Sequence, residues 1–175
     1  MLHRRPPLLA LAALAVVGTL AGCAASPAPT PTPTPAFASD EEAFAAAEEV
    51  YRAYNDAGNA RNAGEPEPNP QDFLVGNALE GDIEGVRLLE EGQLTVDGEV
   101  KVDSVALEEA PVRSQQTKVV VLVCLDVSQV RLMDANGNDV TPRGRADVVA
   151  QEVTFTSDGD DLRISSEASA DVSQC

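Results

Sequence analysis

The chain has 175 residues, of which 29 are acidic and 12 basic, so its formal net charge is −17 at neutral pH. A surface this acidic repels phosphate backbones, which argues against nucleic acid as a partner. The only histidine is His3, and neither a GxxxxGK nor a GxGxxG loop occurs. We therefore expect no histidine-dependent nucleophile, no histidine-containing metal site and no cofactor in the folded part of the chain.

Residues 1–22 have the layout of an export signal peptide. A basic start with Arg4 and Arg5 precedes the uncharged run Leu8–Ala21, and small residues follow. At 14 residues this run is shorter than the roughly 18 that a membrane-spanning helix requires. Its shortness argues against an uncleaved signal anchor.

The run ends in Leu20-Ala21-Gly22-Cys23, which resembles the lipobox of bacterial lipoproteins. The resemblance implies a diacylglyceryl group on the sulfur of Cys23, cleavage just before it, and a further acyl chain such as palmitate on the new N-terminus. Two acyl chains hold a protein stably on a bilayer. The expected location is therefore the extracytoplasmic face of the cell membrane. The alternative is an ordinary signal peptide with an incidental cysteine at its end.

Residues 23–38 predict a tether. Proline occupies every second position from Pro27 to Pro35, and threonine lies between the later prolines. Proline removes backbone donors and fixes φ, so the segment is expected to be extended and solvated, with a reach of up to about 45 Å. Glycosylation of its threonines is left open.

Residues 39–175 predict a single domain that begins with helices. Ser39-Asp40-Glu41-Glu42 forms a capping box, and a helix is expected to continue from it to about Asn55–Gly58. Its apolar stripe comprises Phe44, Ala47, Tyr51 and Tyr54. Residues 59–70 predict a loop. Residues 72–89 return to helical spacing, and because Gly76, Gly81 and Gly85 weaken a helix, two short helices are expected there.

Strands follow from Gln93 onward, where the apolar period changes to two. Residues 94–107 predict a bent strand with a bulge at Asp103-Ser104, since Val100 and Val102 fall on one face and Val105 and Leu107 on the other. Residues 117–133 form the longest run, and they are apolar on both faces from 119 to 125. Such a strand is expected at the centre of the sheet.

The last strands are expected at 146–156 and 162–167. Asn136-Gly137 predicts a hairpin turn within 134–139, and a second turn is expected at 157–160. Helices followed by an antiparallel meander predict an α+β fold, with the N-terminal helices packed on a curved antiparallel β-sheet.

The order of these elements is similar to the cone-shaped NTF2-like domains, also described as a cystatin-like α+β roll, and in particular to actinobacterial lipoproteins of that class. The likeness lies in residues 74–79, in the run 119–128 and in the turn 134–137. It implies a cone between the first helix and the sheet. Because many relatives form dimers through the open face of the sheet, it also implies a possible homodimer.

The chain has three cysteines, Cys23, Cys124 and Cys175. If Cys23 carries lipid, the other two meet a non-reducing compartment, and we expect a disulfide between Cys124 and Cys175. The alternatives are a buried free thiol at Cys124 with a frayed C-terminus, and intermolecular pairing through Cys175.

Two functions are compatible with this sequence. The first is a non-catalytic, membrane-tethered domain that binds an unknown envelope protein or a small ligand. The second is an extracytoplasmic enzyme that uses a buried carboxylate for general acid/base chemistry in the cone. Asp126 is its weak candidate for a catalytic residue, with Tyr51 and Tyr54 beside the cone. A carboxylate buried in an open cavity would favour the enzyme, and a filled cone would favour the binding domain.

Calcium is a further possibility because oxygen ligands cluster in both turns. These residues are Asp134, Asn136, Asn138 and Asp139 in the first turn, and Asp158, Asp160 and Asp161 in the second. An EF-hand loop needs glycine at its sixth position and glutamate at its twelfth, where this chain has Asp139 and Arg145. Turn formation explains the same residues, so no metal site is predicted.

Overall fold

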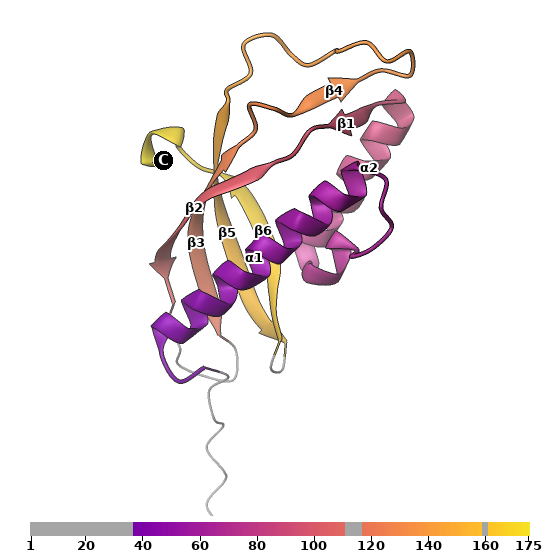
Figure 1. Cartoon of the computed structure of the whole chain (residues 1–175). Coiled ribbons are helices and arrows are strands. Elements are labelled where there is room, and N and C mark those ends of the chain that lie inside the picture. The colour runs from indigo at the N-terminus through magenta and orange to yellow at the C-terminus, as the bar shows by residue number, and fades with distance from the viewer. Residues whose placement is uncertain (1–36, 111–116, 159–160) are drawn as a thin grey trace, which may run out of the picture. The chain divides into compact units, whose positions relative to one another are not determined.

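The computed structural model describes residues 37–110, 117–158 and 161–175 (Figure 1). The signal peptide, Cys23 and the tether up to residue 36 lie outside these residues. Two α-helices, α1 (Asp40–Asn62) and α2 (Gly76–Gly92), are joined through the 3₁₀ helix η1 (Pro70–Phe73). No helix in the described part of the chain is long and apolar enough to cross a membrane.

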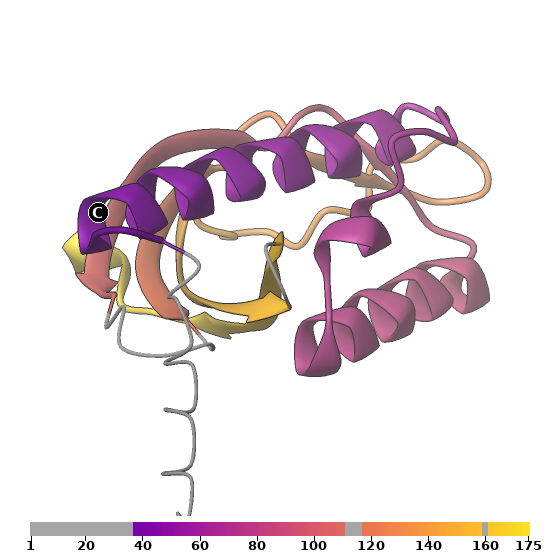
Figure 2. The same cartoon turned by 90° about the horizontal axis from the view of Figure 1, so that it is seen from below.

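The sheet has four antiparallel strands in the order β2-β3-β5-β6. These are β2 (Lys101–Glu109), β3 (Lys118–Asp126), β5 (Val148–Asp158) and β6 (Asp161–Ser169). The short strands β1 (Thr95–Asp97) and β4 (Arg131–Met133) pair separately, and the 3₁₀ helix η2 (Val172–Gln174) follows β6. The sheet curves around α1, which lies across its concave face (Figure 2). The predicted α+β fold, with helices on a curved antiparallel sheet, is confirmed.

The core lies between α1 and the central strand β3. Every residue of β3 from Val119 to Leu125 is buried, as the apolar run predicted. Ala43, Ala47 and Tyr51 of α1 belong to the same core cluster as the alternate valines of β3. Burial of apolar surface stabilises a fold by about 25 cal/mol per Å², so the packing of α1 on β3 stabilises the domain.

Helix α1 starts as predicted and ends later than predicted. Ser39 Oγ accepts a hydrogen bond from the Glu42 amide at 3.2 Å, and Glu42 Oε2 accepts one from the Ala38 amide at 2.8 Å. The helix then continues through Gly58 to Asn62 instead of ending near 55–58. Tertiary hydrogen bonds made by its last turns, described below, outweigh the weak helical preference of Gly58.

The break in the second helical region lies at Leu74 and Val75 and not at the glycines. The Val75 amide donates to the Ile164 carbonyl at 2.8 Å, so the extended chain forms a bridge with β6. Helix α2 then runs through Gly81 and Gly85 without interruption. Only Ala78 of this helix is buried, and the helix therefore adds little to the core.

A bulge at Asp103 is confirmed in β2. Val102 lies opposite Leu125, and Ser104 lies opposite Cys124, so one residue is unpaired between them. The prediction that Val102 and Val105 lie on opposite faces is wrong, because the extra residue brings both against the core.

The predicted strand 117–133 is two strands separated by a turn at 127–130. Gly98 permits this turn to pack against the segment between β1 and β2. Its φ is +90°, and a Cβ at this position would lie 2.2 Å from the Gln129 carbonyl oxygen. The Asn136-Gly137 turn is confirmed, since the Gly137 amide donates to the Asp134 carbonyl at 2.9 Å. The later turn includes residues 159–160, which lie outside the described residues.

The predicted disulfide between Cys124 and Cys175 is present, with an S–S distance of 2.03 Å and a Cα–Cα distance of 5.7 Å. It attaches the C-terminal residue to the central strand. Cys124 is 4% exposed, whereas Cys175 is exposed. The bridge uses two of the three cysteines of the chain, and Cys23 lies outside it.

Candidate functional site

A hollow of about 180 Å³ lies between the C-terminal half of α1 and the concave face of the sheet. We call it the concave hollow. Helix α1 contributes Tyr51, Tyr54, Asn55, Gly58, Asn59, Arg61 and Asn62, and the sheet side contributes Val100, Leu125, Gln151 and Glu167. Most of these side chains carry hydrogen-bonding groups. The cone is therefore filled by apolar side chains along the N-terminal half of α1 and open and polar beside its C-terminal half.

Glu167 is the carboxylate of the concave hollow. It lies on β6 opposite Val153, a core residue, and therefore faces α1. Tyr54 Oη donates a hydrogen bond to Glu167 Oε2 at 3.2 Å. Burial raises the pKa of Glu167 above its usual value; the Tyr54 hydrogen bond opposes this effect, and the nearby charge of Asp82 adds to it. A proton is thus held more firmly here than on an exposed glutamate.

The two tyrosines supply hydroxyl donors. Tyr51 Oη donates to Gln151 Oε1 at 3.0 Å, and the rings of Tyr51 and Tyr54 meet edge to face with centroids 5.8 Å apart. Burial, together with the charge of Glu167, raises the pKa of both tyrosines far above the usual value. Both hydroxyls therefore remain protonated at neutral pH.

Two asparagines of α1 fix the wall formed by Val100. The side-chain amides of Asn55 and Asn59 donate to the Val100 carbonyl at 3.0 and 2.8 Å. The Val100 amide donates in return to Asn59 Oδ1 at 2.9 Å. The backbone just before β2 therefore pairs with a helix side chain in the way that it would pair with a neighbouring strand.

An ion pair closes the end of the hollow near α2. Arg61 donates to both carboxylate oxygens of Asp82 at 2.9 and 2.8 Å, and Gln71 donates to Asp82 Oδ2 at 3.0 Å. Burial by itself would raise the pKa of Asp82, but the bonds from Arg61 and Gln71 outweigh it and the pKa falls below its usual value. Asp82 is therefore ionised at neutral pH, and its charge is paired.

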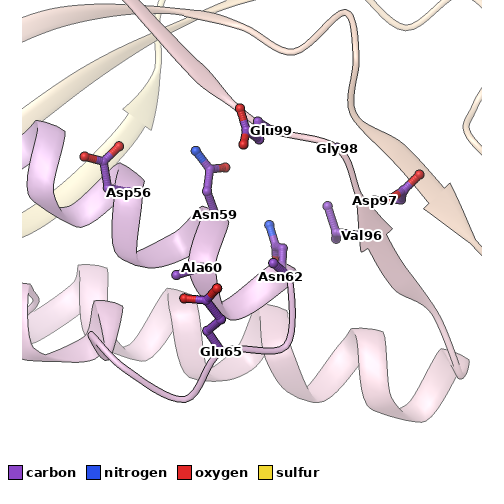
Figure 3. Close-up of a pocket in the computed structure, with 10 residues that line it drawn as sticks. Asp56, Asn59, Ala60, Asn62, Glu65, Val96, Asp97, Gly98 and Glu99 are labelled. Carbon is purple, nitrogen blue, oxygen red and sulfur yellow. The ribbon is translucent and has the colours of Figure 1, made fainter.

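A larger depression of about 450 Å³ lies on the other side of the end of α1, against β1 (Figure 3). It shares Asn59 and Asn62 with the concave hollow. Its carboxylates are Asp56, Glu65, Asp97 and Glu99, and no basic side chain lines it. Figure 3 shows these carboxylates pointing in different directions, as on a solvated acidic surface. We call this depression the acidic groove.

Asp126, the weak catalytic candidate from the sequence, does not line the concave hollow. It lies at the end of β3, one residue after the inward-facing Leu125. Its Oδ1 accepts a hydrogen bond from the Ser128 amide at 2.8 Å. Hydrogen bonds from Ser128 lower the pKa of Asp126, the opposite of what a buried general base requires. Tyr51 and Tyr54, the other two candidates, do line the hollow.

A bulge in β6 explains why the sequence did not predict Glu167 as a site residue. Ile164 lies opposite Phe155, but Ser166 lies opposite Thr154, so Ser165 is the extra residue. Strict alternation from Ile164 would place residue 167 outside, and the bulge places it inside. In addition, a glutamate is normally expected on the surface, so its residue type did not predict that it faces the core.

In the oxygen-rich first turn, the aspartate carboxylates accept hydrogen bonds from nearby backbone amides. Asp134 Oδ1 accepts hydrogen bonds from the amides of Asn136 and Asn138, each at 2.8 Å, and Asp139 Oδ1 accepts one from the Thr141 amide at 2.8 Å. The side chains of Asp158 and Asp160 lie outside what the structure describes. Within the described residues, no group of three or more histidine, cysteine, aspartate or glutamate side chains could hold a metal ion.

No protein-family model and no curated protein matches the chain. Among solved structures, the chain is similar to the intermembrane space region of the chloroplast protein ARC6, at 14% identity and a TM-score of 0.46. The match covers 72% of this chain and 95% of that one. At this level of similarity it supports no argument about the fold or the function of this protein.

Proposed function

We propose that this protein is an extracytoplasmic lipoprotein, anchored to the cell membrane through Cys23, whose domain binds a small ligand in the concave hollow. We further propose that the domain belongs to the NTF2-like class and that it is not an enzyme. The observation that supports the binding role most strongly is the concave hollow itself, where Tyr54, Gln151 and Glu167 bring donors and acceptors to one space of about 180 Å³.

Anchoring is supported by the sequence and by the disulfide. The Leu20–Cys23 motif stands between a short apolar run and a proline-rich segment. Since Cys124 and Cys175 bond to each other, Cys23 is the cysteine that remains for lipid.

The anchoring test is membrane fractionation of cells that express Cys23→Ala. We expect this variant to leave the membrane fraction, while a Cys175→Ser control, which also loses one cysteine, stays there. Retention of Cys23→Ala in the membrane would contradict the anchor. The binding test is an NMR titration of the full-length protein with small polar molecules, in which amide signals of residues 51–62 and 151 should shift.

A second function is supported by Glu167. A carboxylate with a raised pKa beside a tyrosine hydroxyl is an arrangement that enzymes use to take a proton from a substrate. In that case Glu167 is the base, and the hydroxyl of Tyr51 or Tyr54 donates to the developing negative charge. Proton transfer predicts turnover that rises with pH through the pKa of Glu167 and is lost in Glu167→Gln. A pure binding role predicts no turnover.

A further inference from the structure

We propose that the ligand of the concave hollow is a small organic cation, a protonated amine, whose N–H groups donate to the Glu167 carboxylate beside Tyr54. The inference rests on the proposed binding function, because it names the ligand class of that same site. It follows from the charges around Glu167, from the size of the hollow and from the hydrogen-bonding groups that remain available.

Glu167 has no counter-ion in the described part of the chain. Its one hydrogen bond there comes from Tyr54, and none of the ion pairs includes it. Arg61 is the only cationic side chain that lines the hollow, and both of its terminal nitrogens donate to Asp82. A half-buried carboxylate without a counter-ion is unfavourable, and a cationic ligand supplies the missing charge.

The surroundings also favour a cation. The acidic groove shares Asn59 and Asn62 with the concave hollow and is lined by four carboxylates and no basic residue. The whole chain has a net charge of −17. Such a field raises the local concentration of cations and lowers that of anions. An anionic ligand would be repelled both by this field and by the charge of Glu167.

The lining selects an organic cation over a metal ion. Calcium takes six to eight oxygen ligands, whereas this site offers one carboxylate and neutral amides. Tyr54, which is only partly buried and lines the hollow beside Glu167, suits an alkylammonium group, because cations are attracted to aromatic faces. A volume of about 180 Å³ lies below the 300 Å³ or more of a typical ligand pocket, so the ligand is small.

The test uses three probes of similar size and different charge: benzylammonium, benzyl alcohol and benzoate. Each is titrated into the full-length protein in a non-ionic detergent, and binding is followed by calorimetry and by the amide signals of Tyr54 and Gln151. The variants are Glu167→Gln and a control, Glu152→Gln. Glu152 is an exposed glutamate on β5 that lies opposite Leu122 and Ala168 and does not line the hollow, so its substitution removes the same charge elsewhere.

We expect benzylammonium to bind to the wild type and to Glu152→Gln, and to bind roughly tenfold to a hundredfold more weakly to Glu167→Gln. Equal binding of benzyl alcohol and benzylammonium, unchanged in Glu167→Gln, would overturn the cation inference and leave the binding function standing. If none of the three probes shifts the signals of the hollow at millimolar concentration, both proposals fail.

A second readout does not depend on a variant that folds. In wild-type protein, the carboxyl carbon signal of Glu167 reports its titration. Bound benzylammonium should move the midpoint of that titration to lower pH, because a cation favours the ionised carboxylate. Benzyl alcohol should not move it. An unchanged midpoint at saturating benzylammonium would overturn the inference.

Discussion

Removal of the Cys124–Cys175 bond should be among the most damaging changes to this domain that leave its packing intact. The two cysteines are separated by 51 positions in the sequence. In the chain-entropy relation, closing a loop of that length stabilises the folded state by about 4 kcal/mol at 25 °C, because the bond restricts the unfolded chain. The exposed Cys175 is the better one to replace, since Cys175→Ser leaves the packing of the buried Cys124 in place.

The assay is urea unfolding of three samples: oxidised wild type, wild type with reductant, and Cys175→Ser. The two forms without the bond should agree with each other and be about 4 kcal/mol less stable than the first. Their m-values should be larger, because an unfolded chain without the bond exposes more surface. Reductant should not change Cys175→Ser further, which controls for other effects of the reagent. A loss below about 1 kcal/mol would refute the reasoning, since it would mean that the bond does not restrict the unfolded state.

Four further substitutions test other parts of the structure. Gly98→Ala should destabilise the domain by more than about 1 kcal/mol, because φ is +90° and the added methyl group meets the Gln129 carbonyl. Gly85→Ala, in a helix with open space around the new methyl group, should stabilise the domain by up to about 1 kcal/mol. Thermal unfolding of the two variants checks both signs. Asn59→Ala should lower the free energy of unfolding by about 1 to 3 kcal/mol, because it leaves backbone groups before β2 without partners, and urea unfolding measures it. Since burial raises the pKa of Glu167 in the folded state, ionisation favours unfolding; Glu167→Gln should match the wild type near pH 4 and become the more stable of the two as the pH rises through that pKa. A stability difference that does not vary with pH would contradict this assignment.

The sequence was most informative where burial alone decides the structure. The run 119–125 is apolar on both faces, and only a central strand covered on both sides can bury it. The disulfide followed from cysteine count and compartment, and the bulge at Asp103 followed from a change of face in the apolar pattern. Each of these features depends on the types of residue along the chain, so it can be predicted without the structure.

The features that were missed depend on partners that are distant in the sequence. Hydrogen bonds from Asn55 and Asn59 to the Val100 carbonyl hold the end of α1, and no local sequence pattern predicts these bonds. The break before α2 arises because Val75 pairs with Ile164. Glu167 faces the hollow only because of the bulge at Ser165, where the neighbouring residues are polar and a change of face leaves no mark. The candidate site was therefore predicted only in its α1 half, through Tyr51 and Tyr54.

The length of α1 has a consequence for how far the site lies from the start of the domain. The tether joins the domain just before Asp40, and the concave hollow is lined by residues from Tyr51 onward. At 1.5 Å per residue, about 22 Å of helix separates Asp40 from Asn55, which lines the hollow. If the chain is anchored at Cys23, this rigid stretch sets the site apart from the attachment point even when the tether is fully collapsed. Shortening the tether would then alter the freedom of the domain to reorient more than it would alter access to the concave hollow.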